Sequence, residues 1–370
     1  VRTNTTSTVN VANTVITSAT YQDSLDVAAT TSNGKLTLST LGNLIAGANA
    51  DLTVTAATAG SLASTLTLAL TSNARGIADL TNEALTSKTV AVTGTAYDYA
   101  RATLANTSLA FGNVRTGDQA SVGVTNTVTT SASFQDSLDV AASSANGKLT
   151  VSSPANVLAG NTGNVGFTAF AAGSLDATVA LALTSNANSV TDLSNLGLTG
   201  QSIAVTGAAY DYAVSAVTNR TLAFGNVRTA STPAAQTLTF GNTTVSNAAY
   251  QDALLVATSA NNSKLTATGA TITAGTTADL TVAAATTTAG SLADTLAVTQ
   301  TSKAAATGLL DKTLTGLNVA VTGAVYDLAN ATVASSLTLG NVRTNTTRTV
   351  NVANTTITSA TYQDSLDVAA

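Results

Sequence analysis

Any chemistry in this sequence would have to come from carboxylates, hydroxyls or lysines, because the chain contains no His and no Cys. These two absences exclude Ser-His-Asp triads, Cys-His dyads, disulfides and nearly all zinc and transition-metal sites. Paired carboxylates of the glycosidase kind remain, but Asp and Glu together number only 19 and recur as parts of repeated phrases. We therefore predict no enzymatic activity, no catalytic residue and no cofactor.

The most regular carboxylates belong to a Gln-Asp phrase. It places them at Asp23, Asp136, Asp252 and Asp364. Carboxylates at the junctions of surface repeats can bind calcium through their oxygen atoms. No Asp-x-Asp-x-Asp loop accompanies these residues, and acidic side chains are too sparse to gather three around one ion. A role in capping turns is the prediction, and a metal site is not expected.

Lysines also recur at matched positions of a predicted strand, namely Lys35, Lys148 and Lys264. One hypothesis is an amide cross-link between these lysines and the recurring asparagines Asn113, Asn226 and Asn341. The alternative is an outward-pointing lysine that protects a strand edge from pairing with another chain. The second interpretation is the expected one.

The rare aromatic residues gather in a Tyr-Asp-Tyr phrase near the end of each repeat. The residues are Tyr97, Asp98 and Tyr99; Tyr210, Asp211 and Tyr212; and Tyr326 and Asp327, followed by Leu328. We predict an inter-repeat junction, in which the rings pack on the neighbouring repeat and the aspartate bonds to its backbone. The alternative is that one tyrosine caps its own repeat.

These phrases return because the chain is a tandem repeat. The phrase LAFGNVRT occurs at 109–116 and 222–229, and LTLGNVRT occurs at 337–344. Marking each repeat by the valine of this phrase gives Val1, Val114, Val227 and Val342, with spacings of 113, 113 and 115 residues. This period is too long for one coil of a solenoid, whose repeats run to roughly 50 residues, which disfavours a β-solenoid. It is close to the ~100 residues of an immunoglobulin-like sandwich.

Within each repeat, apolar and polar residues alternate, as in KLTLS at 35–39 and TLTLAL at 65–70. A period of two places one side of a strand on a core and the other in solvent. The pattern predicts an all-β fold of tandem immunoglobulin-like sandwiches with about seven strands each. Asn33-Gly34 and Asn146-Gly147 predict tight hairpin turns with positive φ at both residues. Asn262-Ser263 at the third position predicts a different or strained turn.

The expected domains follow from the repeat. They are residues 1–98, a repeat lacking its first strand; 99–211; 212–327; and 328–370, the truncated start of the next repeat. Residues 342–370 match 1–29 except at Ser7/Arg348 and Val15/Thr356. This predicts a super-repeat of 341 residues seen through a window on a longer array. Two forms of continuation stay open, one giant chain or partial domains of separate chains that complete each other.

Composition limits the partners. Charged residues make up 9% and the net charge is −5, with 14 Lys and Arg spread thinly. Nucleic-acid binding needs clustered cations, so none is predicted. No apolar run reaches the ~20 residues of a membrane helix, so no insertion of this segment is expected. The absence of Cys and Met, the easily oxidised residues, suits an extracellular or cell-surface location.

The recurring phrases support a resemblance. LAFGNVRTGD with the following VGVTNT, the mid-repeat AGSL and the closing VAVTGAAYDYA resemble bacterial surface proteins with "choice-of-anchor D" repeats, similar to domains of the ASPM-SPD-2-Hydin type. The resemblance covers essentially the whole chain through strands and turns. It implies a secreted or surface-attached protein of immunoglobulin-like sandwiches, and no catalytic residues.

We predict a structural repeat protein of an extracellular fibre, sheath or surface stalk. Its expected partner is itself, as a homopolymer or as the continuation of a longer array, with lateral bundling through a hydroxyl-rich surface. The alternative is an adhesin whose repeats present or form a carbohydrate- or protein-binding surface.

Overall fold

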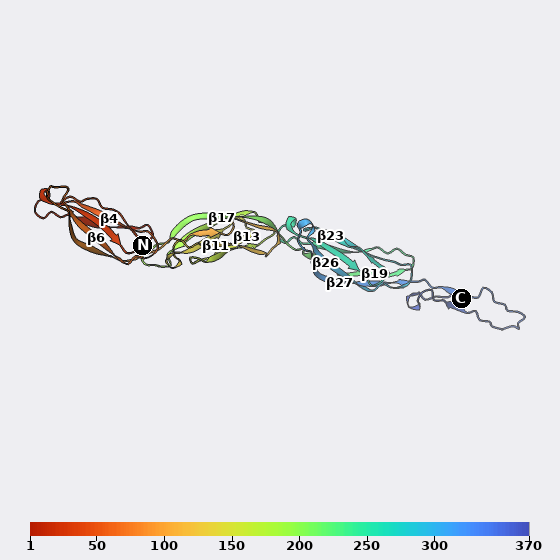
Figure 1. The fold of residues 1–370 in the computed structure, drawn as a ribbon. Coiled ribbons are helices and arrows are strands. Elements are labelled where there is room, and N and C mark those ends of the chain that lie inside the picture. The colour runs from red at the N-terminus through yellow and green to blue at the C-terminus, as the bar shows by residue number, and fades with distance from the viewer. Residues whose placement is uncertain (370) are drawn as a thin grey trace. The chain divides into compact units, whose positions relative to one another are not determined.

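The structure is a computed structural model that describes residues 1–369, apart from the side chain of Ala306. The described chain forms β-strands joined by loops and by 3-10 turns of three residues each. It divides into two compact units, which are described separately. Unit one comprises residues 1–111, 119–168 and 176–206, and unit two comprises 112–118, 169–175 and 207–370. Figure 1 shows the strands of each sandwich.

The first sandwich lies in unit one. Its elements are β1 (Thr6–Ala12), η1 (Ala19–Tyr21), β2 (Ser24–Thr31), β3 (Leu36–Leu38), β4 (Asn49–Ala56), β5 (Gly60–Ser61), β6 (Ser64–Asn73), β7 (Glu83–Val92) and β8 (Thr95–Ala96). One sheet has the order β1-β4-β3 and the other β2-β6-β7, with β5 paired to β8. The residues of β4 that face the core are Leu52, Val54 and Ala56, and all three are buried. The alternation in the sequence therefore produces the two-sided strand that it predicts.

The second sandwich has its core in unit one. Its elements are β9 (Ala102–Leu104), β10 (Ser108–Arg115), β11 (Gln119–Asn126), η2 (Ala132–Phe134), β12 (Ser137–Ser143), β13 (Leu149–Ser152), β14 (Thr162–Ala169), β15 (Gly173–Ser174), β16 (Ala177–Asn186) and β17 (Leu196–Tyr210). One sheet has the order β13-β14-β11-β9, and the other contains β17, β16 and β12. Phe167 of β14 is fully buried between the sheets.

The third sandwich lies in unit two. Its elements are β18 (Ser215–Val217), β19 (Thr221–Arg228), β20 (Gln236–Asn242), η3 (Ala248–Tyr250), β21 (Ala253–Ser259), β22 (Leu265–Ala267), β23 (Ala270–Ile272), β24 (Thr277–Ala284), β25 (Gly290–Ser291), β26 (Asp294–Lys303), η4 (Ala305–Thr307) and β27 (Lys312–Tyr326). Its sheets have the orders β18-β20-β24-β22 and β19-β27-β26-β21-β23. The pairing of β19 with β27 is parallel, with Leu222 opposite Val321.

Unit two continues into a segment, residues 328–369, with little regular structure. Its elements are β28 (Ala331–Val333), β29 (Val352–Asn354) and η5 (Ala360–Tyr362). β28 and β29 pair antiparallel, and residues 334–351 between them carry no strand.

The predicted fold class, tandem all-β immunoglobulin-like sandwiches, is confirmed by these sheets and by three separate cores. The cores run from Val11 to Ala96, from Ala100 to Val205 and from Ala213 to Val325. The proposed boundaries after residues 98, 211 and 327 stay predictions. Short strands such as β5 and β15, which pair with the last strands of their repeats, add to the seven that the pattern predicted.

The prediction for the Asn-Gly turns was wrong. Neither Asn33 nor Gly34 has a positive φ. Instead, the Leu36 N–H donates to the Asn33 carbonyl (3.1 Å), and the Lys35 N–H donates to Asn33 Oδ1 (3.0 Å). The asparagine side chain thus makes an Asx turn at ordinary φ, which needs no glycine at the next position. Asn262 forms the same two bonds with Ser263 after it, so the third turn neither differs nor is strained.

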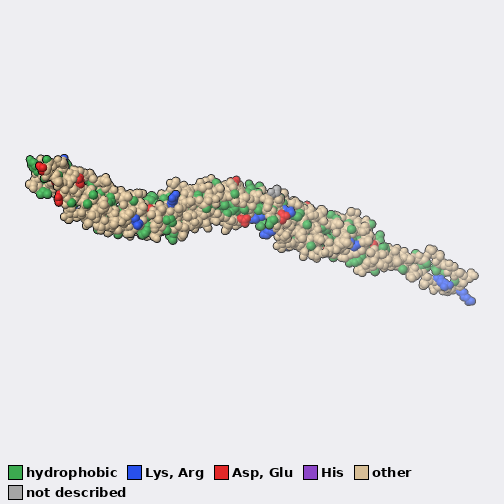
Figure 2. Space-filling view, viewed as in Figure 1, with side chains coloured by type: hydrophobic (Ala, Val, Ile, Leu, Met, Phe, Trp, Pro, Cys, Tyr) green, Lys and Arg blue, Asp and Glu red, His purple; other side chains and the backbone are tan. Residues whose placement is uncertain are grey.

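Among the described residues, no helix is long and apolar enough to cross a membrane. In the same part of the chain, no three Asp or Glu side chains gather where they could hold a metal ion. Charged side chains are few and scattered over the face seen in Figure 2, which is mostly polar and uncharged.

Candidate inter-repeat junction

The aspartates of the Tyr-Asp-Tyr phrases pair with the Gln-Asp phrases that follow them in the chain. We define junction one by Asp98 and Gln135, junction two by Asp211 and Gln251, and junction three by Asp327 and Gln363; these three pairs form isolated parallel β-bridges. Junction one lies within unit one, and the other two lie within unit two.

The backbone of Asp98 pairs with the following repeat on both sides. Its N–H donates to the Phe134 carbonyl (2.9 Å), and its carbonyl accepts from the Asp136 N–H (3.0 Å). The same two bonds recur at Asp211 and at Asp327. Main-chain hydrogen bonds therefore join each repeat end to the next Gln-Asp phrase. These bonds fix the spacing of the two segments and do not depend on the side chains.

The first tyrosine of the phrase packs on an aromatic residue of the next repeat. The rings of Tyr97 and Phe134 have centroids 5.9 Å apart at 63°. Tyr210 and Tyr250 are 5.5 Å apart, and Tyr326 and Tyr362 are 5.7 Å apart. Edge-to-face and tilted pairs at these separations are favourable because the positive ring edge meets the negative face.

The aspartate side chains of the phrase are buried in different environments. Asp211 accepts hydrogen bonds from Thr116 Oγ1 (2.9 Å) and from Ser246 Oγ (2.6 Å). Asp98 is also buried, and its Oδ2 has no hydrogen-bond partner within residues 1–369. This aspartate thus bonds to the next repeat through its main chain at every junction, and at junction two its side chain also accepts from the Ser246 hydroxyl of that repeat.

The centre of each junction is an ion pair that the sequence reasoning missed. Arg2 Nη1 lies 2.6 Å from Asp136 Oδ1, and Arg115 Nη2 lies 2.9 Å from Asp252 Oδ2. In both pairs the arginine side chain is 11% exposed and the aspartate 1%. Arg228 pairs with Asp364 at junction three, where both side chains are more exposed. The signal was present, since the arginine belongs to the LAFGNVRT phrase that marks every repeat.

A serine hydrogen-bonds to the junction aspartate and comes from the same repeat as that aspartate. Ser185 Oγ donates to Asp136 Oδ2 (2.6 Å) and accepts from the Ala100 N–H (2.8 Å). Ser302 makes the same bonds to Asp252 and to the Ala213 N–H (2.7 and 2.8 Å). The hydroxyl thus joins the aspartate to the chain just after the Tyr-Asp-Tyr phrase, so the carboxylate is oriented toward the arginine.

The second tyrosine of the phrase lies under the arginine. The Arg2 guanidinium carbon is 4.5 Å from the ring centroid of Tyr99. At junction two, two cations lie over the Tyr212 ring. The Arg115 guanidinium carbon is 4.2 Å and Lys312 Nζ is 4.1 Å from the ring centroid. Cations at these distances from a ring are attracted by about 0.5–2 kcal/mol. The third repeat has Leu328 here and makes no such contact, and that side chain is exposed.

An Asn–Gln pair shapes the loop that carries the aspartate. Gln135 Nε2 donates to Asn126 Oδ1 (2.9 Å), and Asn126 Nδ2 donates to the Asp136 carbonyl (2.8 Å). The same pairing occurs between Gln22 and Asn13, with matching bonds at Gln251 and Gln363. Because Asn126 and Gln135 are buried, these amides fix the loop backbone in the second repeat.

Asp23 of the first sandwich is the counterpart of Asp136 and Asp252, and it keeps their contact with a serine. It accepts from Ser72 Oγ (2.7 Å), as its counterparts accept from Ser185 and Ser302. No arginine pairs with it among residues 1–369. Asp136, Asp252 and Asp364 thus serve as partners for arginine, whereas the sequence predicted turn capping.

Lys264 and Asn113, two residues of the cross-link hypothesis, have other partners. Lys264 Nζ donates to the Thr288 carbonyl (2.8 Å), and Asn113 Nδ2 donates to the Thr307 carbonyl (2.7 Å). The alkyl chain of Lys35 covers the site where a Cβ on Gly60 would lie. Lys35 and Lys264 lie across a glycine of their own repeat, Gly60 and Gly290, where their methylenes shield the turn.

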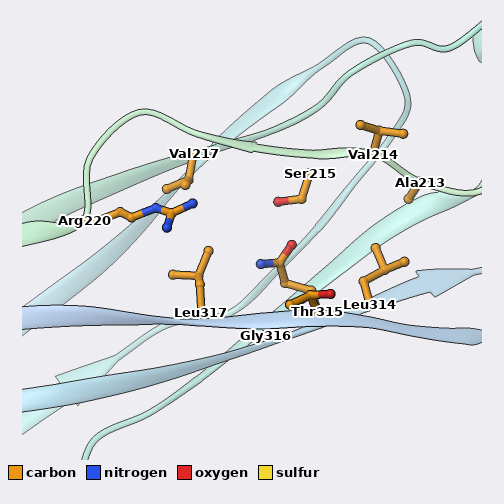
Figure 3. Close-up of a pocket in the computed structure, with 10 residues that line it drawn as sticks. Ala213, Val214, Ser215, Val217, Arg220, Leu314, Thr315, Gly316 and Leu317 are labelled. Carbon is orange, nitrogen blue, oxygen red and sulfur yellow. The ribbon is translucent and has the colours of Figure 1, made fainter.

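A surface pocket of about 510 Å³ opens in the third sandwich between β18, β26 and β27. Figure 3 shows Arg220 and Ser215 directed toward it, with Leu317 and Val217 on its walls. Gln300 of β26 also lines it and is only 3% exposed. A guanidinium, an amide and a hydroxyl beside apolar walls can bind an anionic or hydroxylated group. The lining contains no aromatic ring on which a sugar could stack.

No protein-family model matches the chain. No curated protein matches it either. Among solved structures, it is similar to domains 4–9 of the surface layer protein SbsC, with 16% identity, a TM-score of 0.23, and coverage of 83% of this chain and 40% of that one. The chain thus spans about two fifths of that structure.

Two further structures are similar at the same low level. Mouse cadherin-23 EC22–24 has 10% identity, a TM-score of 0.35, and coverage of 84% and 88%. An endo-fucoidan hydrolase of glycoside hydrolase family 107 has 11% identity, a TM-score of 0.24, and coverage of 88% and 42%. Similarities of this size transfer no role to this chain, and its resemblance to "choice-of-anchor D" proteins stays a prediction.

Proposed function

We propose that the chain is a structural repeat protein of an extracellular fibre, sheath or surface stalk. The observation that supports this proposal most is the junction, which recurs with the same backbone bridge, the same ring pair and an arginine–aspartate pair. Junctions one and two resist bending, because opening them would separate two nearly buried, directly paired charges.

The surface supports the same role. Few charged side chains interrupt it, so neighbouring copies can approach without strong repulsion and associate through hydroxyl groups (Figure 2). With only 14 Lys and Arg in 370 residues, trypsin-like proteases have few cleavage points. An extracellular location follows from these properties as part of the proposal.

Small-angle scattering of the whole chain tests the role of the junctions. We expect the maximum dimension of the native chain to change little between low and high salt, because the ion pairs of junctions one and two are nearly buried and weakly screened. The combined variant Arg2→Met and Arg115→Met should give a broader distribution of dimensions. A matched control, Arg75→Met and Arg101→Met, removes two exposed arginines and should behave like the native chain. Equal flexibility in all three proteins would refute a stiffening role.

A second candidate, an adhesin, is favoured by the pocket of the third sandwich. At the matched positions the second sandwich has Thr107 where the third has Arg220, and Leu183 where it has Gln300. The polar lining is therefore particular to one repeat. Glycan-array binding by the native chain, lost in the variant Arg220→Thr and Gln300→Leu, would support this candidate. Leu183 is buried in the second sandwich and Thr107 is exposed, so these substitutions should leave the fold intact.

A further inference from the structure

Gln300 is a polar side chain at a core position of the third sandwich. It follows Val298 on the buried side of β26 and is 3% exposed. The matched residues of the other two repeats are Leu183 and Leu70, and both pack against the cores of their own sandwiches. A core glutamine in place of leucine breaks the apolar pattern of the strand, and such breaks are expected at functional sites.

The carboxamide of Gln300 has no hydrogen-bond partner within the described chain, and it lines the pocket between β18, β26 and β27. Buried polar groups are nearly always hydrogen-bonded, because an unpaired amide loses its bonds to water and gains none in return. A ligand in the pocket would supply the missing bonds. The burial of Gln300 and its lack of a partner therefore indicate a binding site.

The pocket of about 510 Å³ has the size of a small-molecule site. Arg220 lines it from the loop after β18, and its exposed guanidinium forms no ion pair in the part of the chain that the structure describes. Figure 3 shows Arg220 and Ser215 directed toward the same space. The lining thus carries one positive charge and no carboxylate.

The second sandwich has the same backbone here and fills the corresponding space with side chains. Its β17 bulges against β16 as β27 bulges against β26. Gln201 Nε2 donates to the Ala102 carbonyl of the opposite sheet (3.3 Å), and Leu183 packs beneath. The third sandwich has Leu317 at the position of Gln201 and has its amide at Gln300 instead. The amide that bridges the sheets in one repeat therefore faces a pocket in the next.

The lining residues define the chemistry of a ligand. The guanidinium of Arg220 presents a planar fork of N–H donors that matches a carboxylate. A carboxamide offers both donors and an acceptor, which suits a hydroxyl group, and Ser215 adds a hydroxyl of its own. Leu317 and Val217 are aliphatic walls that can pack against C–H groups. A single cation without a second one beside it favours a monoanion over a phosphate dianion.

We propose that this pocket binds a hydroxycarboxylate of the uronic acid kind, with its carboxylate on Arg220 and its hydroxyl groups on Gln300 and Ser215. The proposal rests on the second candidate function, the adhesin, and narrows its ligand from glycans in general to acidic sugars. A free uronic acid and the end of an acidic polysaccharide share this chemistry, so the test includes both.

NMR titration of the whole chain with sodium glucuronate tests the proposal. A ligand of this size should bind with a dissociation constant on the order of 1 mM. We expect shifts in the backbone amides of Ser215–Val217 and Leu314–Leu317 and in the side-chain amide of Gln300. Glucose, which lacks the carboxylate, should bind at least ~10-fold more weakly. An oligomer of glucuronate that binds as well as the monosaccharide identifies a polysaccharide end as the source, and one that does not bind identifies the free acid.

Two variants separate the roles of the charge and the amide. Arg220→Thr, the residue type of Thr107, should weaken glucuronate binding at least ~10-fold and remove the preference over glucose. The control Arg101→Thr changes an exposed arginine of the second sandwich and should leave binding as it is. Gln300→Leu should abolish binding and also raise the urea midpoint of the chain, because it removes an unpaired buried amide. This second measurement needs no ligand, and a lowered midpoint would contradict an unpaired Gln300.

Other outcomes would overturn the inference. They are the absence of pocket shifts at glucuronate concentrations far above the expected dissociation constant, and binding of cyclohexanecarboxylate as tight as that of glucuronate, since that acid has no hydroxyl groups. Glycan-array binding confined to neutral glycans, and lost in the variant Arg220→Thr and Gln300→Leu, would overturn the acidic ligand and leave the adhesin candidate standing. The scattering experiment tests the structural role of the junctions separately.

Discussion

Replacing Arg115 by methionine should open junction two and leave junction one closed. The Arg115 side chain is 11% exposed and its partner Asp252 is 1% exposed, with 2.9 Å between Nη2 and Oδ2. Nη2 also donates to the Leu310 carbonyl (3.1 Å). Charge centres about 4 Å apart attract by about 4 kcal/mol at an effective dielectric constant near 20.

The free energy of opening lost on substitution should be close to this attraction. Methionine keeps part of the packing of the arginine stem, but it leaves Asp252 buried without its cation. Removing one partner of a buried pair costs about 3–5 kcal/mol. The effect has a ceiling, since an opened junction returns Asp252 to water. We therefore expect the free energy of local opening to fall by about 3–5 kcal/mol or to the full stability of the junction, whichever is smaller.

Hydrogen exchange of the bridging amides measures this opening. The amides are the Asp211 N–H, which donates to Tyr250, and the Asp252 N–H, which donates to Asp211. A loss of 3–4 kcal/mol corresponds to exchange about 10²–10³-fold faster. The equivalent amides of Asp98 and Asp136 lie in junction one and report on the same sample as an internal reference.

Arg101→Met is the matched control, because this arginine is exposed and in no ion pair of the described chain. A double-mutant cycle with Asp252→Asn isolates the pairwise term. We expect a coupling of about 2–4 kcal/mol, well above the 0.2–1 kcal/mol of exposed pairs. If exchange at Asp211 rises less than ~3-fold, or the coupling falls in the range of exposed pairs, the reasoning about a buried junction charge is refuted.

Three smaller changes have defined outcomes. Tyr212→Leu, the residue type of the third repeat, removes the ring under the junction arginine and should speed exchange at junction two ~2- to 30-fold, whereas Tyr21→Leu at a 91% exposed ring should not. Gly34→Ala should raise the free energy of unfolding in urea by about 0.4–1 kcal/mol, because its φ is negative and a Cβ there meets nothing; a loss would contradict the Asx turn. Hydrogen bonds, first from Asn43, lower the pKa of Asp26 below 3.8, so its small stabilisation is complete above that pH and is lost as pH falls through the lower, folded pKa; NMR titration of Asn43→Ala should show the Asp26 pKa returning toward 3.8.

Much of the architecture was predictable because it depends on local alternation. Leu52 and Val54 in DLTVT already place one side of β4 on a core, and the observed burial follows that pattern. The turn at Asn33 was not predictable from the Asn-Gly pair, since asparagine can use its side chain in place of a positive φ. Asn262 with serine after it was the available clue, because a turn that tolerates serine does not need glycine.

The junction was half predictable for a different reason. Rare aromatics at repeat ends, such as Tyr97 and Tyr210, indicated a special place because nothing in a sandwich core requires them there. The partners Arg115 and Asp252 lie 137 residues apart in different phrases, and no periodicity within a repeat connects them. Recurrence showed that the arginine and the aspartate are kept in each repeat. It did not show that they contact each other, because that contact depends on how one sandwich packs against the next.

The junction also has a direction that follows from its parts. Arg115 comes from the end of β10, which pairs with β17, the last strand of its repeat. The aspartates that bind the preceding repeat's arginine lie in the loops after β11 (Asp136) and β20 (Asp252). Ser72 holds Asp23 as Ser185 holds Asp136, although Asp23 has no arginine partner in the described chain. The serine–aspartate hydrogen bond is therefore present with or without an arginine partner. Because the arginine and the aspartate come from different places in a repeat, junctions of this kind all have the same direction along the chain.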